Sequence, residues 1–438
     1  MLAKYYQNLK DLIWFKTISW DADYAEDINN ASEWICNLLA ENSISAKIIN
    51  GYWNPIVFWN YFIDANLPTC LFYAHYDVKN AQKSEWWKHE PFSLYIGRDS
   101  VIGRWVSDDK WLLLIWLMSI FDLIKDWDLG YNIKIVIEWD ETIWSPKLEN
   151  FFRDHRDLLK SDFCLISDTN IIADNPCLDV WYRWNINMEL KLITAKTDLH
   201  SWTFGWLVPN AIHELSLLLS RLYDINNRVT IPYFYYDVEP VPIPIYLKNK
   251  RLKFNSEKVM QDTGVRFLLK DKDTDIYTQI WLKPTVQITG INWWYVWKWF
   301  QDSIPNSATV KINFRTVRNQ HIDKIINSFE QWLKFNVSTY VDYKLEVLDY
   351  CDACKVDVNN SYVQRAEKFL KAIFQKEVIY KYSWWALPIL NSFKDILWAS
   401  QVLVPLANED CNSHGVNENL TIDMVEKAFT FFRNYLAK

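Results

Sequence analysis

Apolar runs followed by histidine or carboxylate residues constrain this chain more than any other feature. Three such runs occupy residues 70–73, 133–137 and 163–166. Each is typical of a buried strand, and His75, Glu138 and Asp168 follow them in that order. An apolar helix is expected at 112–124, between the first two runs. Strands that alternate with helices predict an α/β sheet with polar groups gathered at the strand ends.

A different pattern begins near Trp184 and ends near Val356. The residues between them predict a strand, a helix, two strands, a helix and a strand, which is the order of a ferredoxin-like unit. We therefore predict that residues 1–183 and 356–438 form one α/β domain, and that residues 184–355 form an α+β domain inserted in it. Residues 223–283 are polar and loop-rich, and no elements are assigned to them.

Charge and hydropathy exclude several classes of partner. The net charge is −7 and no block of Lys or Arg occurs, so neither nucleic acid nor an anionic membrane is expected. The longest apolar run, 111–118, is too short to cross a bilayer. Seven scattered cysteines, an odd number, favour a reducing compartment and predict a cytoplasmic protein.

Tryptophan is abundant and glycine is scarce. The chain has 26 Trp and 8 Gly, whereas average usage would give about 30 Gly at this length. Trp127 stands in a turn composition, and Trp residues also occur as pairs where tight backbone is expected. Some bacterial genetic codes read UGA as glycine and others as tryptophan, so our hypothesis is that many of these residues are glycine in the organism. A carbohydrate-binding aromatic face would instead need regular spacing, and these residues cluster in turns.

The segment around His75 suits a metal site. Neutral imidazole binds zinc, and a carboxylate such as Asp77, two residues on, would hold the other ring nitrogen and set the tautomer. A single His-x-Asp is common in ordinary surfaces and cores. The argument therefore depends on further polar residues in strand ends or loops, namely Asp108, Glu141, Asp168 and His414.

Seven stretches in this order resemble the M20 family of zinc amidohydrolases, which includes dipeptidases, aminoacylases, carboxypeptidases and succinyl-diaminopimelate desuccinylases. The stretches are 74–78, 103–111, 138–145, 198–202, 304–306, 313–315 and 414–419. The family usually has glycine at nine positions that are tryptophan here, which supports the glycine hypothesis independently. These positions are Trp105, Trp111, Trp139, Trp144, Trp202, Trp293, Trp294, Trp384 and Trp385.

The resemblance implies a zinc-exopeptidase-like catalytic domain with an inserted lid and dimerisation domain, and a centre of two zinc ions. Its metal ligands would be His75, Asp108, Asp168 and His414. Asp108 would bridge the two ions, with His75 and Asp168 on one ion and His414 on the other. Such an ion pair polarises an amide carbonyl and activates water.

The resemblance also implies roles for four further residues. Asp77 would stand behind His75, and Glu141 would be the general base that passes a proton to the leaving amine. In the inserted domain, His200 would stabilise the transition state and Arg315 would bind a substrate carboxylate with its planar fork. The family counterpart of His200 reaches the site of the partner subunit, which implies a homodimer.

Thr142 departs from the family pattern. The family has a glutamate there that binds the second metal, and a neutral hydroxyl is a poor zinc ligand. The second zinc is therefore weak, bound through water or another carboxylate, or absent. A shift of register by one residue, which would exchange the roles around Asp140 and Glu141, is the other interpretation.

Taken together, the sequence predicts an enzyme that hydrolyses an amide bond next to a free carboxylate, most simply a dipeptidase or exopeptidase acting on small peptides. The alternative enzyme is an N-acyl amino acid deacylase. Thr142 also motivates a hypothesis of another class, a dimeric binding protein without catalysis.

Overall fold

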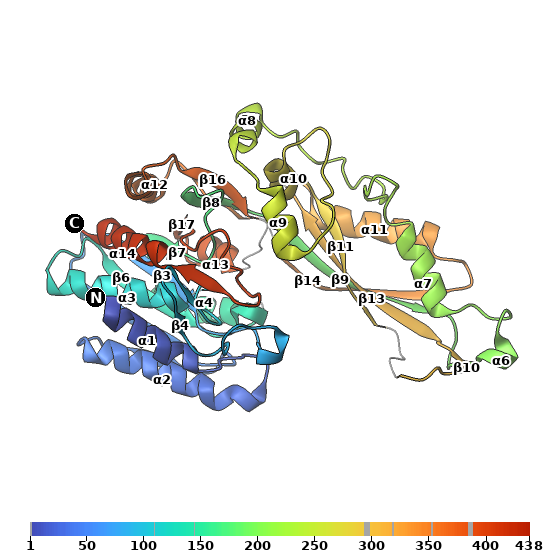
Figure 1. The fold of residues 1–438 in the computed structure, drawn as a ribbon, viewed down its shortest axis with the longest axis horizontal. Coiled ribbons are helices and arrows are strands. Elements are labelled where there is room, and N and C mark those ends of the chain that lie inside the picture. Colours follow the sequence, from blue (N-terminus) through green and yellow to red (C-terminus); the bar gives the residue numbers. More distant parts are fainter. Residues whose placement is uncertain are drawn as a thin grey trace. The chain divides into compact units, whose positions relative to one another are not determined.

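The structure, a computed structural model, describes residues 2–108, 110–143, 145–292, 298–317, 319–351, 354–383 and 389–438. It divides into two units, drawn in Figure 1 and described separately here. Unit 1 comprises the described residues of 2–181, 354–381 and 389–438. Unit 2 comprises those of 182–351 together with 382–383.

Unit 1 is built on a six-stranded sheet of order β1-β2-β6-β3-β7-β17. These strands are β1 (Lys47–Ile49), β2 (Ile56–Tyr61), β6 (Asn132–Glu138), β3 (Thr69–His75), β7 (Phe163–Ile166) and β17 (Ser400–Leu403). β6, β3, β7 and β17 pair in parallel, whereas β2 pairs antiparallel with both β1 and β6. The three strands predicted from apolar runs are therefore neighbours in the parallel part of this sheet.

The helices of unit 1 include the apolar helix expected at 112–124, which the structure places at α3 (Lys110–Lys125). Residues 111–117 of α3 are all buried, as expected for a helix that is apolar on every side. It packs with α1 and α14. The other helices are α1 (Leu2–Trp14), α2 (Ala25–Glu41), α4 (Leu148–Asp154), α5 (Arg156–Leu159), α12 (Ser361–Phe374), α13 (Ile389–Asp395) and α14 (Ile422–Leu436), with short 3-10 helices η1 (Ala22–Tyr24), η2 (Lys83–Glu85) and η3 (Glu141–Ile143).

The other described strands of unit 1 form two small sheets. One has the order β18-β5-β4, with β18 (Asn419–Thr421), β5 (Ser100–Ile102) and β4 (Tyr95–Ile96). The other has the order β15-β8-β16, with β15 (Cys354–Lys355), β8 (Cys177–Tyr182) and β16 (Ile379–Ser383). The pairing of β18 with β5 ties the chain just after residue 418 to the chain before residue 103.

Unit 2 has the predicted ferredoxin-like arrangement. Its antiparallel sheet has the order β11-β13-β9-β14, and α7 and α11 lie between strands in the chain. The elements are β9 (Trp184–Ile193), α7 (Ala211–Ser220), β11 (Thr285–Asn292), β13 (Ser307–Thr316), α11 (Ile322–Asn336) and β14 (Asp342–Cys351). The α/β fold with an inserted α+β unit is therefore confirmed.

The remaining elements of unit 2 are short. They are β10 (Leu199–His200), α6 (Ser201–Phe204), α8 (Ile243–Arg251), α9 (Ser256–Thr263), α10 (Ile276–Leu282) and β12 (Ser303–Ile304). Helices α8, α9 and α10 lie in the segment 223–283, to which the sequence analysis assigned no elements.

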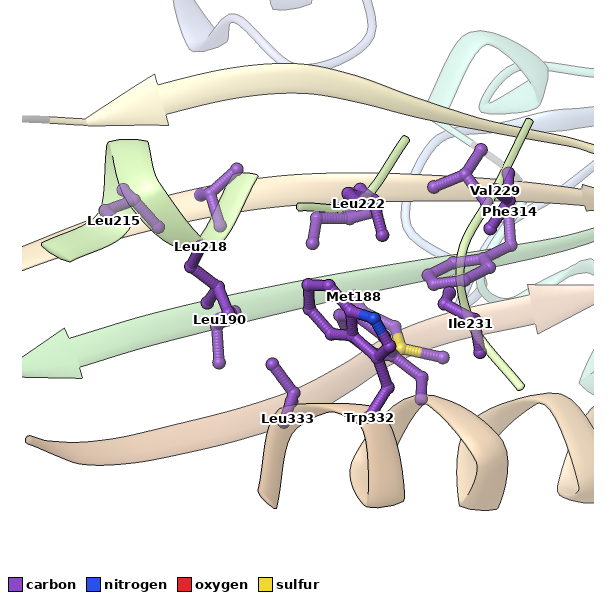
Figure 2. Close-up of a cluster of buried hydrophobic side chains, with 14 of the residues drawn as sticks. Met188, Leu190, Leu215, Leu218, Leu222, Val229, Ile231, Phe314, Trp332 and Leu333 are labelled. Atoms are coloured by element: carbon purple, nitrogen blue, oxygen red, sulfur yellow. The ribbon is translucent and has the colours of Figure 1, made fainter. Parts of the chain in front are cut away.

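One face of the unit 2 sheet carries its core. Alternate residues of β9, among them Met188 and Leu190, point to the same face, because side chains alternate along a strand. Leu215 from α7 and Trp332 from α11 pack on them, as Figure 2 shows. The two helices and the sheet therefore enclose one apolar layer.

The described tryptophans often stand in backbone that suits glycine. Six of them have φ between 53° and 80°, the left-handed region, where an aromatic side chain is strained. They are Trp53, Trp86, Trp105, Trp127, Trp206 and Trp398. Buried tryptophans present a second difficulty, since seven indole N–H groups in the described part of the chain have no hydrogen-bond acceptor. Both observations support the glycine hypothesis, while Trp144, Trp293, Trp294, Trp384 and Trp385 lie outside the described residues.

Candidate metal centre

Three parallel strands bring the sequence-predicted residues of unit 1 to one edge of the main sheet. β3 ends at His75, which pairs in register with Glu138, the last residue of β6. Glu141 follows in η3, and Asp168 stands two residues after β7. The carboxyl ends of parallel strands share one edge, which is where ligand sites occur in open α/β sheets.

His75, Asp108 and Asp168 form a cluster with the arrangement of metal ligands. Nε2 of His75 is 3.8 Å from Oδ1 of Asp108 and 3.9 Å from Oδ1 of Asp168. One donor atom from each of the three residues lies within 4.8 Å of the other two. A cation with nitrogen and oxygen ligands at about 2.0–2.2 Å fits among donors at this spacing after a contraction of a few tenths of an ångström. One imidazole and two carboxylates are also a donor set that zinc and similar divalent metals accept.

Asp108 lies between two histidines. Its Oδ1 faces His75, and its Oδ2 is 2.6 Å from Nε2 of His414. His414 belongs to the loop between β17 and β18 and has a φ of 63°, a strained value for histidine. The placement agrees with the bridging role expected for Asp108, and the four expected ligands therefore lie in one place.

Asp77 holds the other side of the His75 ring. Its Oδ1 is 3.1 Å from Nδ1 of His75, so the carboxylate accepts the Nδ1 proton and leaves the Nε2 lone pair directed at the cluster. The same carboxylate accepts the backbone N–H groups of Glu141 at 3.2 Å and Thr142 at 2.8 Å. It also accepts the hydroxyl of Thr142. Asp77 therefore orients both His75 and the start of η3.

Glu141 borders the cluster and Asp140 does not. Oε2 of Glu141 is 3.9 Å from Nε2 of His75. Oδ1 of Asp140 instead accepts a hydrogen bond from Nδ2 of Asn54 at 2.8 Å. This geometry favours the unshifted register, in which Glu141 is the candidate base.

The electrostatics of the cluster favour a bound cation. Burial raises the pKa of Glu141 well above its ordinary value, and the negative charges of Asp168 and Asp108 raise it further, against the effect of His75. Burial and the Asp108 charge also raise the pKa of Asp168. Burial would raise the pKa of Asp108 as well, but His414 and His75 hold it below its usual range. A divalent cation at this point would remove the mutual repulsion of the carboxylates.

A second set of residues supports the loops of the centre, and the sequence analysis assigned it no role. Glu418 is fully buried and accepts hydrogen bonds from N and Oγ of Ser107, at 3.0 and 2.9 Å. It also pairs with Nη1 of Arg104 at 3.0 Å. Because Ser107 precedes Asp108 and Glu418 follows His414, this network joins the two loops that carry those ligands. The only sequence signal was the presence of all three residues in family-like stretches.

The expected substrate residues, His200 and Arg315, lie in unit 2. His200 is exposed at the N-cap of α6, where its Nδ1 accepts the N–H of Trp202 at 3.3 Å. Arg315 is on β13, and its Nε donates to Oδ1 of Asn313 at 2.9 Å. Their roles stay predictions.

Among the residues that the structure describes, no helix combines the length and the hydropathy that crossing a membrane requires.

Comparisons with known sequences point to one family. Residues 186–340 match the domain family M20_dimer, described as "Peptidase dimerisation domain". The chain is 24% identical over 382 residues to the Beta-Ala-His dipeptidase of Rattus norvegicus, covering 84% of this chain and 76% of that protein. It is 26% identical over 390 residues to the Cys-Gly metallodipeptidase DUG1 of Saccharomyces cerevisiae, covering 84% and 78%.

Solved structures of M20 peptidases share the fold. The dipeptidase Dug1p of Saccharomyces cerevisiae has a TM-score of 0.86 at 22% identity, covering 99% of this chain and 95% of that chain. An M20 metallo-carboxypeptidase from Sulfolobus solfataricus has a TM-score of 0.86 at 23% identity, with coverage of 99% and 98%. A dinuclear metal-binding M20 peptidase from Bacillus subtilis has a TM-score of 0.62 at 11% identity, with coverage of 99% and 97%.

Proposed function

Because the chain belongs to the M20 peptidases, we propose that it is a metal-dependent dipeptidase that hydrolyses the peptide bond next to a free carboxylate. The relatives named dipeptidases support this choice of substrate. The single observation that carries the proposal is the convergence of His75, Asp108 and Asp168, which are far apart in the chain, on one buried point.

The proposed metal is zinc, and its ligands are His75, Asp108 and Asp168, with His414 on the far side of Asp108. A bound zinc ion would polarise the scissile carbonyl and lower the pKa of a water molecule to about 7. Asp77 would accept the Nδ1 proton of His75, so that the Nε2 lone pair would be directed at the metal.

Glu141 is the proposed proton carrier. Its Oε2 lies at the edge of the ligand cluster, where it would accept the proton of the attacking water and donate it to the leaving amine. Burial and the neighbouring carboxylates raise its pKa, and the positive charge of a bound cation would act against both and favour the ionised form that is needed in a base.

Unit 2 supplies the proposed recognition of substrate. Arg315 offers a planar fork of N–H donors to the free carboxylate, and Asn313 orients it through the bond to Nε. His200 would act in the site of a partner subunit, which makes the proposed enzyme a homodimer, as the match to a dimerisation domain supports.

A cytoplasmic location is also proposed. The support is that Cys36, Cys70, Cys164, Cys177 and Cys411, the described cysteines with placed side chains, are unbridged.

The test is a substrate panel on zinc-loaded protein. Free dipeptides, including Cys-Gly and β-Ala-His, are compared with N-acetyl and N-succinyl amino acids. We expect turnover of the dipeptides, and turnover of the acylated set alone would establish the deacylase instead. Glu141→Gln is expected to lower kcat about 10²–10⁴-fold, whereas the matched variant Asp140→Asn, one residue away, retains turnover.

The departure at Thr142 favours one further candidate, a dimeric binding protein. Zinc content distinguishes it from the enzyme. A chain that binds dipeptides without holding zinc or hydrolysing them would replace the proposed function by this candidate.

A further inference from the structure

We propose that the centre holds one zinc ion tightly, at His75, Asp108 and Asp168, and that its second metal position is incomplete because of Thr142. The inference rests on the proposed function and deepens it. It sets this chain apart from the dinuclear M20 peptidase of Bacillus subtilis, whose fold it shares.

Thr142 is committed to Asp77. Its backbone N–H donates to Oδ2 of Asp77 at 2.8 Å, and its hydroxyl donates to the same oxygen. Ser19 completes the group, since its Oγ is 3.3 Å from Oδ2 of Asp77 and 3.3 Å from Oγ1 of Thr142. Oγ1, the only polar atom of the Thr142 side chain, is therefore used in the hydrogen bond to Asp77.

Neighbouring carboxylates are engaged elsewhere in the described structure. Oδ1 of Asp140 accepts from Asn54 at 2.8 Å. Glu138 accepts from the hydroxyl of Tyr73 at 2.6 Å and from the backbone N–H groups of the two residues that follow it. Each would have to give up hydrogen bonds inside a buried environment in order to replace the missing ligand, and each buried group left without its partner is costly.

The buried pair Glu418 and Arg104 is engaged too. Glu418 is held by Arg104 at 3.0 Å and by both donors of Ser107. Releasing it would leave a buried guanidinium without its counter-charge, which is strongly unfavourable. Glu141 borders the cluster but is the proposed base. The second position is therefore left with His414 and the shared Asp108 as its protein ligands among the described residues.

These two ligands are already in contact. Nε2 of His414 is 2.6 Å from Oδ2 of Asp108, so a second cation must first separate them. At the first position the distances are longer, because Nε2 of His75 stands 3.8 and 3.9 Å from the two carboxylates. With one anionic ligand fewer and a hydrogen bond to break, the second ion is expected to bind at least about 100-fold more weakly than the first.

The primary test counts metal on the unmodified full chain. The protein is loaded with excess Zn²⁺, passed through gel filtration in a buffer with a weak chelator, and analysed for zinc per chain by inductively coupled plasma mass spectrometry. We expect one zinc per chain. Two retained zinc ions would overturn the inference and leave the proposed function standing, whereas none would overturn the proposed function itself.

A pair of variants tests whether residue 142 is the reason that only one zinc is retained. Thr142→Glu supplies an anionic ligand and is expected to raise the number of zinc ions per chain from one to two. Thr142→Gln introduces a neutral side chain of the same shape as glutamate and is expected to keep that number at one. Circular dichroism establishes that both variants are folded. A folded Thr142→Glu chain that still holds one zinc, or a Thr142→Gln chain that holds two, would contradict the role given to Thr142.

Discussion

Asp77 shows how one side chain can organise a centre. It accepts hydrogen bonds from the His75 ring, from two backbone N–H groups of η3 and from the hydroxyl of Thr142. A carboxylate that accepts several donors is held in one orientation. The tautomer of His75 and the direction of Glu141 are therefore set by the same group, which explains how a loop can place the proposed base beside a proposed ligand.

Tryptophan at positive φ leads to the first prediction. Trp127 has a φ of 57° and is 83% exposed, so its ring contributes little packing in return for the strain. Trp127→Gly is expected to stabilise the protein by about 0.5–1 kcal/mol, because glycine adopts this conformation without the steric cost. Thermal unfolding measures the change.

The control for this prediction is another exposed tryptophan. Trp14 is 71% exposed and ends α1 without a positive φ, so Trp14→Gly should not stabilise the protein. Equal effects of the two substitutions would contradict the argument from φ. The intact mass of the protein from its own organism tests the glycine hypothesis directly, and a mass that matches 26 tryptophans would refute it.

Asp140 gives a prediction about pH. Burial raises the pKa of its carboxyl to about 7, against the effect of the bond from Asn54, whereas an unfolded aspartate titrates near 4. Between these values unfolding releases a proton, so the contribution of Asp140 to stability falls as pH rises. The advantage of Asp140→Asn over the unmodified chain should therefore grow between pH 4 and pH 8, by about 1–3 kcal/mol.

Urea unfolding at the two pH values measures this change. Asp273→Asn, which removes an exposed aspartate of unit 2, is the matched control and should shift stability equally at both. An Asp140→Asn effect that is the same at pH 4 and pH 8 would mean that folding leaves the pKa of Asp140 unchanged.

The site residues that could be predicted from the sequence are those that follow a recognisable strand. His75 and Asp168 were placed correctly because an apolar run and the residue after it form a local signal. The partnership of Glu418 with Arg104 was not predicted, since 314 residues separate them and no periodicity links them. The sequence thus locates the expected ligands near strand ends, while the contacts that support them depend on tertiary packing.

Residues 223–283 contained signals of another kind. α9 begins after Asn255, α10 begins after Asp275, and both cap residues accept a backbone N–H. Gly264 ends α9 in the left-handed conformation. These caps are readable in a sequence, but the helices are short, and the surrounding polar composition obscured them.

The ion pair and hydrogen bonds of Glu418 lead to a prediction for the loops before α3 and β18. Glu418→Gln keeps the shape of the side chain but leaves Arg104 buried without its counter-charge. The variant should lose about 3 kcal/mol of stability and bind zinc about 10–100-fold more weakly, because Asp108 and His414 are no longer held together. Competition with a chromophoric chelator measures the zinc affinity.

Ser107→Ala is the milder comparison. It removes the 2.9 Å bond from Oγ and leaves the ion pair with Arg104 intact. A smaller loss of zinc affinity is expected than for Glu418→Gln. Unchanged zinc affinity in a destabilised Glu418→Gln chain would limit Glu418 to a role in folding.

The assembly of two chains can be tested with inactive variants. If His200 acts in the partner's centre, a mixed dimer of a Glu141→Gln chain and a His200→Ala chain contains one complete site. Random assortment would then restore about a quarter of the activity of the unmodified enzyme. Co-expression of differently tagged chains, followed by a dipeptide assay, measures the recovery.

A second mixture is the control. Glu141→Gln and Asp168→Asn chains each damage the centre of their own unit 1, so their mixed dimer has no complete site. Recovery in neither mixture would place the action of His200 in its own chain.

The pairing of β17 with β7 has a consequence for biosynthesis. The main sheet is completed only when the segment that begins at Ser400 pairs with the segment that begins at Phe163. The whole of unit 2 leaves the ribosome between the two. Such distant pairing slows folding and prolongs exposure of an open strand edge. His414 emerges later still, so the nascent chain cannot bring the four expected metal ligands together until the chain has been made beyond both inserted unit 2 and β17.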